Sequence, residues 1–286
     1  LIVAMLMDEC AKGSVVLQLG RSVSAVEHGD GAYRVSCGDQ TAVAPALVIA
    51  TGGPSIPKMG ATGFAYDLAR RFGLKVVEPR PALVPLTLGG DEILFRSLSG
   101  ISAEVVVRCG AARFREAALF THRGLSGPAI LQISSYWRHG ESIGIDFLPS
   151  LQPGWLVALK RGRPRASLHS VLAGVLPARL AAKLAELLAD RLAVGGELAN
   201  VSDRTLAEAE RQLSDWRFNP NGTEGFAKAE VTAGGISTDH LSSQSLEARK
   251  VPGLYAIGEA IDVTGWLGGY NFQWAWASAW AAAQKL

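Results

Sequence analysis

The stretch Gly253-Leu-Tyr-Ala-Ile-Gly-Glu-Ala-Ile-Asp-Val-Thr-Gly-Trp-Leu-Gly-Gly-Tyr-Asn271 holds the pattern that decides the fold. A short apolar strand at residues 254–257 runs into an acidic, glycine-rich turn and then into an apolar helix beginning near Tyr270. The glycines allow a ligand to approach the backbone closely, and the first helical turn offers unpaired N–H groups. Glu259 and Asp262 can accept hydrogen bonds from sugar or ribityl hydroxyls. The stretch therefore indicates either a nucleotide-cofactor site or an ordinary strand–turn–helix whose glycines serve packing.

Two more glycine turns follow apolar strands elsewhere in the chain. Residues 47–50 run into Thr51-Gly52-Gly53, and residues 229–233 run into Gly234-Gly235. A buried strand that ends in a glycine loop is typical of the ligand edge of a parallel sheet. Three such turns in one chain favour a shared ligand cleft. The sequence contains no Walker P-loop, HExxH or GxSxG pattern, and so gives no sign of the chemistries those motifs serve.

Breakers and composition divide the chain into three parts. The turn His28-Gly-Asp-Gly31 favours a hairpin within a small antiparallel meander, because its glycines tolerate positive φ. Pro79, Pro81 and Pro85 then interrupt regular structure, and a strand pattern ending in glycines returns at residue 229. We therefore predict an α/β, Rossmann-like nucleotide-binding domain at residues 1–84 and 229–286. A β-barrel-like and then helical insert is expected at residues 85–228.

Local patterns also predict the individual elements. Strands are expected at residues 14–19, 23–27, 32–37, 40–43, 47–50, 75–77, 104–108, 117–121, 142–147, 229–236, 245–249 and 254–257. Helices are expected at residues 1–11, 60–72, 126–133, 168–176, 178–192, 206–216 and from 270 onward. Thr205 and Glu208 have the spacing of a capping box for the helix at 206–216.

Composition and charge exclude several classes of protein. The chain has 286 residues and a formal net charge of only +2, so its average charge indicates neither a nucleic-acid nor an anionic-membrane partner. The one dense basic run, Lys160-Arg161-Gly-Arg163-Pro-Arg165, can contact phosphates, but a solvated loop is the simpler interpretation. Cys10, Cys37 and Cys109 are far apart, which suits a reducing compartment and gives no metal-site spacing. Without a membrane-spanning run or signal segment, we expect a cytoplasmic protein that acts on a small molecule.

Longer motifs resemble a known family. The segments at residues 120–131, 229–235 and 258–275, together with residues 50–63 and 80–86, are similar to the HI0933-like family of bacterial flavoproteins. The resemblance covers essentially the whole chain. It implies a two-dinucleotide-binding-domain FAD fold with an insert, and an FAD-dependent oxidoreductase activity. One member of the family reduces double bonds in steroid-like acids, but nothing in this sequence selects that substrate.

The resemblance also implies where the cofactor lies. The Thr51-Gly52-Gly53 turn would lie against it, Val23 near the adenine, and Glu259 near the ribityl or pyrophosphate region. The helix N-terminus would lie beside the isoalloxazine, where its dipole stabilises negative charge on the reduced ring. The implied cofactor-binding set is Val23, Thr51, Gly52, Gly53, Gly234, Gly235, Gly258, Glu259, Asp262, Gly265, Gly268, Gly269, Tyr270, Asn271 and Phe272.

Catalytic residues and the electron donor are less defined. His122, Arg123 and Tyr270 are polar candidates if the insert closes over the flavin. A hydrolytic role for His122 has no acidic partner to support it, and an ordinary loop histidine is the alternative. No second dinucleotide fingerprint is present, so an NAD(P)H donor would have to use the same cleft.

The sequence departs from the family pattern in one respect. The family begins with a strand and GxGxxG turn that hold the FAD pyrophosphate, and this sequence contains no GxGxxG. Leu1 also falls within what reads as a helix, so we expect the chain to be a fragment of a longer protein. The alternative function is therefore a non-catalytic remnant or a flavin-binding interaction module.

Overall fold

Strand β14 (Leu254–Ala256), which opens the quoted stretch, pairs in parallel with β4 (Leu47–Ile49). The computed structural model describes residues 1–286. After β14 the chain forms a 3-10 turn, η5 (Gly258–Ala260), and then helix α8 (Tyr270–Ala283). Strand β13 (Val231–Ile236) pairs antiparallel with β5 (Val76–Ala82). Helix α2 (Phe64–Arg71) packs against this pair.

The first part of the chain forms the predicted meander of β1 (Ala25–Gly29), β2 (Ala32–Cys37) and β3 (Gln40–Ala44). Asp30 and Gly31 both have positive φ, 54° and 74°, as a two-residue hairpin turn requires. The predicted hairpin is confirmed. Helix α1 (Ile2–Lys12) precedes the meander and has no buried residue.

Two predicted strands are wrong. Residues 14–19 form no strand, and Val16 and Leu19 are each 82% exposed. Residues 245–249 make only isolated bridges, Leu241 to Ala248 and Glu247 to Tyr255. Both segments carry apolar residues suited to a strand, but neither finds a continuous ladder partner. Strand propensity depends on such pairing more than on the residue itself.

The middle of the chain contains a seven-stranded sheet in the order β11-β10-β7-β8-β9-β6-β12. The strands are β6 (Leu86–Thr87), β7 (Ser102–Cys109), β8 (Ala112–Phe120), β9 (Gly124–Ser126), β10 (Ile143–Asp146), β11 (Trp216–Phe218) and β12 (Gly222–Thr223). Helix α3 (Pro128–Ser134) packs on β8, with Pro128 in its first turn as predicted. Because the strand order has two ends, these pairings do not close a barrel, and the expected barrel is not confirmed.

Helices gather beyond this sheet. They are α4 (Trp155–Gly162), α5 (Leu168–Leu172), α6 (Ala178–Leu192) and α7 (Asp203–Ser214). Two 3-10 helices, η2 (Gly90–Leu98) and η3 (Leu198–Asn200), contact α6 and α4 respectively. The bounds of α6 match the prediction. The capping box at Thr205 is wrong, because α7 begins earlier and the Ser202 side chain accepts the Thr205 N–H at 3.1 Å.

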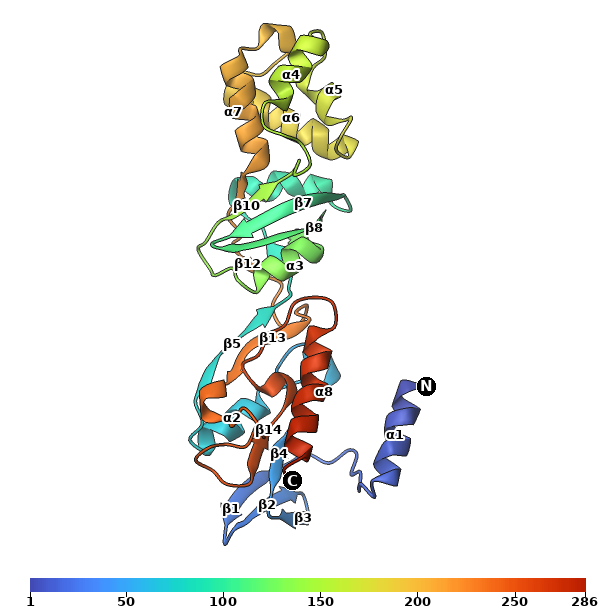
Figure 1. Cartoon of the computed structure of the whole chain (residues 1–286), viewed down its shortest axis with the longest axis vertical. Helices are drawn as coiled ribbons and strands as arrows, with labels where there is room; N and C mark the ends of the chain where they lie inside the picture. Colours follow the sequence, from blue (N-terminus) through green and yellow to red (C-terminus); the bar gives the residue numbers. More distant parts are fainter.

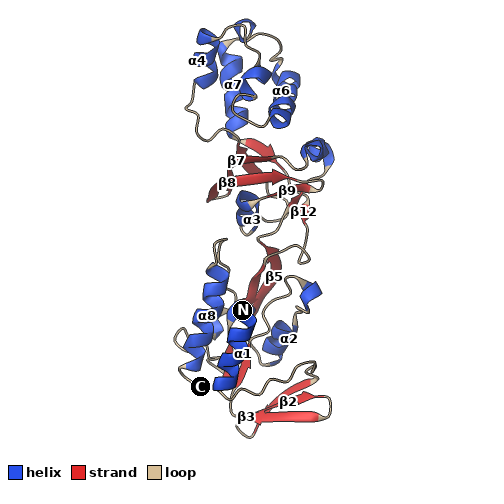
Figure 2. Cartoon of the chain, turned by 90° about the vertical axis from the view of Figure 1, so that its right-hand side faces the viewer, coloured by secondary structure: helices blue, strands red, loops and turns tan.

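The molecule is elongated, with three tiers (Figures 1 and 2). One tier contains β4, β14, β5, β13, α2 and α8, the next the seven-stranded sheet, and the last α4 to α7. The buried residues form two main cores that share no member: one of 15 residues between Tyr33 and Ile261, and one of 38 between Leu86 and Phe218. The domain boundaries at 84/85 and 228/229 stay a prediction.

Free thiols occur at all three cysteines, with Cys10 and Cys37 half-buried and Cys109 buried. None of the helices combines the length and the apolar character that crossing a membrane would need.

Candidate functional site: the glycine turns at the start of helix α8

The structure brings the three predicted glycine turns together. Gly53 lies so close to the β13 turn that an added Cβ would be 2.5 Å from Thr232 Oγ1. Gly235 packs on the η5 turn, where an added Cβ would be 2.8 Å from the Ala260 carbonyl oxygen. The η5 turn is held to α8, because the Gly258 N–H donates to Ser278 Oγ at 2.9 Å. The three glycine segments therefore lie close together, but Gly234 and Gly235 lie inside strand β13 and not in the predicted turn after it. A ligand cleft shared by all three segments stays a prediction, because only glycines before α8 line the cavity at this location.

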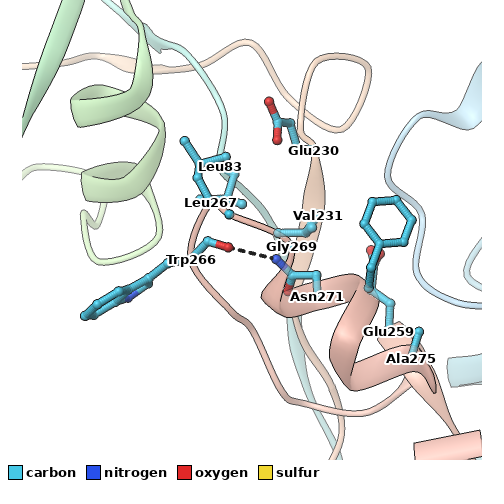
Figure 3. A pocket seen from close by; sticks show the side chains of 11 residues that line it. Leu83, Glu230, Val231, Glu259, Trp266, Leu267, Gly269, Asn271 and Ala275 are labelled. Carbon is cyan, nitrogen blue, oxygen red and sulfur yellow. Dashed lines mark hydrogen bonds between the residues drawn. The ribbon is translucent and has the colours of Figure 1, made fainter. Parts of the chain in front are cut away.

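A cavity of about 240 Å³ opens at this location, at the N-terminus of α8 (Figure 3). Its lining residues are Leu83, Glu230, Val231, Glu259, Trp266, Leu267, Gly268, Gly269, Asn271, Phe272 and Ala275. Ligand pockets for drug-sized molecules usually measure about 300–1,000 Å³. This cavity thus has room for a ring system rather than for a whole dinucleotide.

Backbone donors at the start of α8 are free. No hydrogen bond in the structure uses the N–H groups of Gly268, Gly269, Tyr270, Asn271 or Phe272. Gly269 is the N-cap residue with φ 93°, and an added Cβ there would meet no atom within 4 Å. Several unpaired N–H groups and the positive end of the helix dipole thus face open space beside the cavity.

A side-chain amide braces the loop that enters the helix. Asn271 Oδ1 accepts the Gly265 N–H at 2.8 Å, and Asn271 Nδ2 donates to the Gly265 carbonyl at 3.1 Å. A longer contact joins Asn271 Nδ2 to the Trp266 carbonyl at 3.4 Å (Figure 3). Asn271 therefore holds the glycine loop in place, and its side chain is engaged within the protein.

Acidic and hydroxyl groups lie behind the cavity. Glu259 Oε1 accepts the Thr232 N–H at 2.8 Å, and Thr232 Oγ1 lies 2.7 Å from Ser55 Oγ. The Tyr66 hydroxyl is buried and has no hydrogen-bond partner. Burial, and then the charges of Glu259 and Asp262, raise the pKa of Tyr66 well above its ordinary value, so it stays protonated. The Tyr66 hydroxyl is thus a donor without an acceptor, near the carboxylates of Glu259 and Asp262. A hydroxyl or carbonyl group of a ligand can supply the missing partner.

Comparison with known proteins identifies the family. The family model described as the HI0933-like protein Rossmann domain matches residues 1–285. The chain belongs to the HI0933-like family. A ribosomal RNA dihydrouridine synthase of Escherichia coli is 47% identical over all of this chain and 71% of its own length. The enzyme of that name from Haemophilus influenzae is 43% identical over all of this chain and 72% of its own length. A 3-dehydro-bile acid delta(4,6)-reductase of Clostridium scindens is 29% identical over 99% of this chain and 72% of its own length.

The cavity of this HI0933-like chain has free N–H groups and apolar lining residues, a combination that fits a flavin ring. A flavin bound there would supply hydride chemistry. The N–H groups of residues 269–272 would bind its electronegative edge. The match also supports a Rossmann-like α/β domain, although no GxGxxG is present.

Several predicted site residues of this HI0933-like chain lie in or beside the cavity. Glu259, Gly268, Gly269, Asn271 and Phe272 line it. Seven others lie in neighbouring segments without lining it: Gly234 and Gly235 in strand β13, Tyr270 at the start of α8, and Gly53, Gly258, Asp262 and Gly265 in loops and turns. Gly234 and Gly235 are fully accounted for by packing, since an added Cβ on either would overlap neighbouring backbone. Their cofactor contacts stay a prediction.

Other predicted residues lie outside the lining. Val23 precedes β1 and is 39% exposed, and Thr51 and Gly52 follow β4 without lining the cavity. His122 and Arg123 occupy the turn between β8 and β9, where Arg123 Nη1 lies 3.4 Å from Glu224 Oε2. Neither lines the cavity, and no observation gives them a catalytic role.

Sequence reasoning missed six lining residues, namely Leu83, Glu230, Val231, Trp266, Leu267 and Ala275. Ala275 follows Phe272 by three positions, so helical spacing could have found it. Leu83, Glu230 and Val231 come from the ends of two strands that are far apart in sequence and pair at Val231 and Ala82. No local signal marks that pairing.

Proposed function

We propose that this protein uses a bound flavin to reduce the C5–C6 double bond of a uridine in ribosomal RNA, giving dihydrouridine. The reaction adds a hydride to one carbon of the double bond and a proton to the other. A bound flavin, once reduced by a two-electron donor such as NAD(P)H, would supply the hydride, and solvent would be the ultimate source of the proton. The observation that carries the proposal is the cavity at the N-terminus of α8, with its free N–H groups, in a chain 47% identical to a ribosomal RNA dihydrouridine synthase.

The residues around the cavity support a reductase rather than a hydrolase. The free N–H groups of residues 269–272 can stabilise the negative charge that a reduced flavin carries. The buried side chains of Leu83 and Val231 give a bound ring an apolar wall. The bile acid reductase at 29% identity also acts on a double bond by its name, but its lower identity makes RNA the stronger choice of substrate.

This proposal departs from the expected absence of a nucleic-acid partner. That expectation came from a net charge of +2, which averages the whole chain and says nothing of local surfaces. A ribosomal RNA substrate agrees with the expected cytoplasmic location. NAD(P)H as electron donor stays a prediction.

The test is direct production of dihydrouridine. The chain, and separately a form extended upstream to the length of the Escherichia coli relative, are supplied with FAD, unmodified ribosomal RNA and either NADPH or dithionite. Mass spectrometry of nuclease digests should find two hydrogens added to uridine. Because dithionite reduces the flavin chemically, activity with dithionite but not with NADPH would mean that only the electron donor is wrong.

The outcomes separate the proposal from the non-catalytic alternative. A yellow protein that leaves every uridine intact with both reductants would refute the RNA proposal. A colourless extended form would refute flavin binding itself and favour the non-catalytic alternative. If only the extended form bound flavin, the residues that bind the FAD pyrophosphate would lie outside this chain.

An exposed tryptophan beside the cavity is suited to hold the base. Trp266 is 50% exposed, and its indole points away from the other lining side chains (Figure 3). Its Nε1 donates to Tyr136 Oη at 2.6 Å, and the Phe114 ring meets it edge-on with centroids 5.3 Å apart. The indole is thereby fixed with an exposed surface. Since a uridine must leave its stack before it can be reduced, we expect it to stack on Trp266.

Replacing Trp266 with alanine should lower kcat/KM for ribosomal RNA roughly tenfold to hundredfold, the value of one base stack. Tyr136→Phe keeps the ring and removes only the acceptor of an exposed N–H, so its effect should stay within about threefold. Steady-state kinetics with RNA, and flavin oxidation by a small dye, provide the measurement. Equal loss with dye and RNA, or full RNA activity in Trp266→Ala, would contradict the assignment.

A further inference from the structure

A cluster of four arginines at the far end of the molecule has no role in the site described above. Arg161 lies in the last turn of α4, Arg163 and Arg165 in the loop after it, and Arg204 in the first turn of α7. All four are exposed, and no hydrogen bond or ion pair in the structure engages their side chains. We call these four residues the basic tip.

Specific contacts hold the basic tip together. Lys160 Nζ donates to the Val201 carbonyl at 2.7 Å and to Asp203 Oδ1 at 2.9 Å, which joins the end of α4 to the start of α7. The Ala199 N–H donates to the Pro164 carbonyl at 2.9 Å, which fixes the loop that carries Arg163 and Arg165. The arginines are solvated, as the simpler interpretation of the sequence predicts, and the backbone that carries them is anchored.

Nearby acid does not neutralise the cluster. Asp203 is engaged by Lys160, whose hydrogen bond and charge hold the pKa of Asp203 below its ordinary value. Residues 155–214 contain nine Lys and Arg but six Asp and Glu, a net +3 against +2 for the whole chain. The net positive charge of the protein is therefore concentrated in the helical tier, and the rest of the chain is slightly acidic.

The chemistry of the basic tip favours RNA over a membrane. The planar guanidinium group of arginine donates several N–H hydrogen bonds to one phosphate, which suits the phosphodiester backbone of RNA. Peripheral membrane binding usually also inserts large apolar side chains. No large hydrophobic residue between 150 and 174 is among the exposed ones, so the surface lacks that second contribution.

We propose that the basic tip binds the phosphate backbone of the RNA substrate and so positions it for the cavity at α8. This inference rests on the proposed function, and it adds a size requirement. The tip and α8 lie in opposite end tiers of an elongated molecule (Figure 1). An RNA that touches both therefore has to extend past the seven-stranded sheet, which lies between these tiers. A short uridine-containing oligonucleotide can reach the cavity alone.

The test compares two charge-matched variants in the flavin-loaded protein. The tip variant carries Arg161→Gln, Arg163→Gln and Arg165→Gln. The control carries Arg70→Gln, Arg115→Gln and Arg217→Gln, which removes the same charge from exposed, ion-paired arginines elsewhere. Binding to ribosomal RNA, to a short uridine oligonucleotide and to phosphatidylglycerol vesicles is measured across a series of salt concentrations.

Ribosomal RNA affinity should fall roughly tenfold to hundredfold in the tip variant at near-physiological salt, and the slope of log affinity against log salt should fall by about two to three. The control should stay within about threefold, and oligonucleotide binding should be unchanged in both. The proposal would be overturned if both variants lost the same RNA affinity or if the tip variant bound RNA as tightly as the wild type. It would also be overturned if the wild-type protein bound vesicles but not RNA.

The readouts also separate this proposal from the proposed function. If the tip variant lost RNA affinity, RNA binding by the basic tip would be supported even if no dihydrouridine formed. If the tip variant formed dihydrouridine and bound RNA with unchanged affinity, the proposed function would stand and the proposal that the basic tip binds RNA would be wrong.

Discussion

Replacing Gly269 with valine is expected to abolish flavin binding. Gly269 is the N-cap of α8 with φ 93°, and the position of an added Cβ is open, beside the cavity and the free N–H groups of the first turn. A branched side chain there would fill the space through which a ring approaches the backbone. We expect affinity to fall at least about hundredfold, or about 2.7 kcal/mol. Flavin fluorescence titration of the reconstituted protein measures it.

Gly140 supplies the matched control for this substitution. Its φ is 91°, and an added Cβ there would likewise meet no atom within 4 Å. Gly140→Val therefore carries a similar backbone strain, of about 1–2 kcal/mol, at a turn that does not line the cavity. Flavin affinity should be unchanged in Gly140→Val. Wild-type affinity in Gly269→Val would show that the ring does not approach α8.

Replacing Gly234 with alanine is expected to destabilise the fold severely. Gly234 has φ 87°, and an added Cβ would overlap the carbonyl group of Glu78 and lie 3.0 Å from Pro79 Cα. These are backbone atoms of the paired strand β5, so they can yield only by opening the β13–β5 pair. We expect a loss of at least about 4 kcal/mol, in the range reserved for overpacking and strain together. Chemical denaturation followed by circular dichroism measures it.

Gly60 separates the two causes of that loss. Its φ is 89°, but an added Cβ there would meet no atom within 4 Å. Gly60→Ala should therefore cost only the strain, about 1–2 kcal/mol. Similar losses in the two variants would mean that the tight approach of β13 to β5 contributes nothing. A stable Gly234→Ala protein that no longer binds flavin would instead restore the cofactor role predicted for this glycine.

Local pattern was sufficient where an element is long or strongly punctuated. Helix α6 (Ala178–Leu192) has the predicted bounds, because its apolar residues repeat with helical spacing over fifteen positions. The turn after His28 formed as predicted, because only a few residue types tolerate two consecutive positive φ values. The apolar strands at 47–49 and 254–256 were likewise correct, although their parallel pairing is not a local property.

Local pattern failed where a second segment makes the choice. Residues 14–19 have strand-like composition, but no strand pairs with them. The start of α7 was misplaced because Ser202 and Thr205 are both competent N-caps, and the structure uses Ser202. The arginines of the basic run are solvated as predicted, but the contacts that fix their backbone could not be predicted locally, because Val201, Asp203 and Ala199 lie well over thirty residues away.

The sequence by itself determined that glycines follow the apolar strands β4 and β14, that α8 begins with free backbone donors, and that the chain resembles one family of flavoproteins. These features are local, since they depend on backbone conformations that glycine allows and on the geometry of a helix end. Tertiary structure alone decided which glycines border open space and which are packed against backbone. Gly269 opens onto the cavity, while Gly234 and Gly235 are pressed against neighbouring backbone. A glycine is equally suited to both uses, and only the position of another strand distinguishes them.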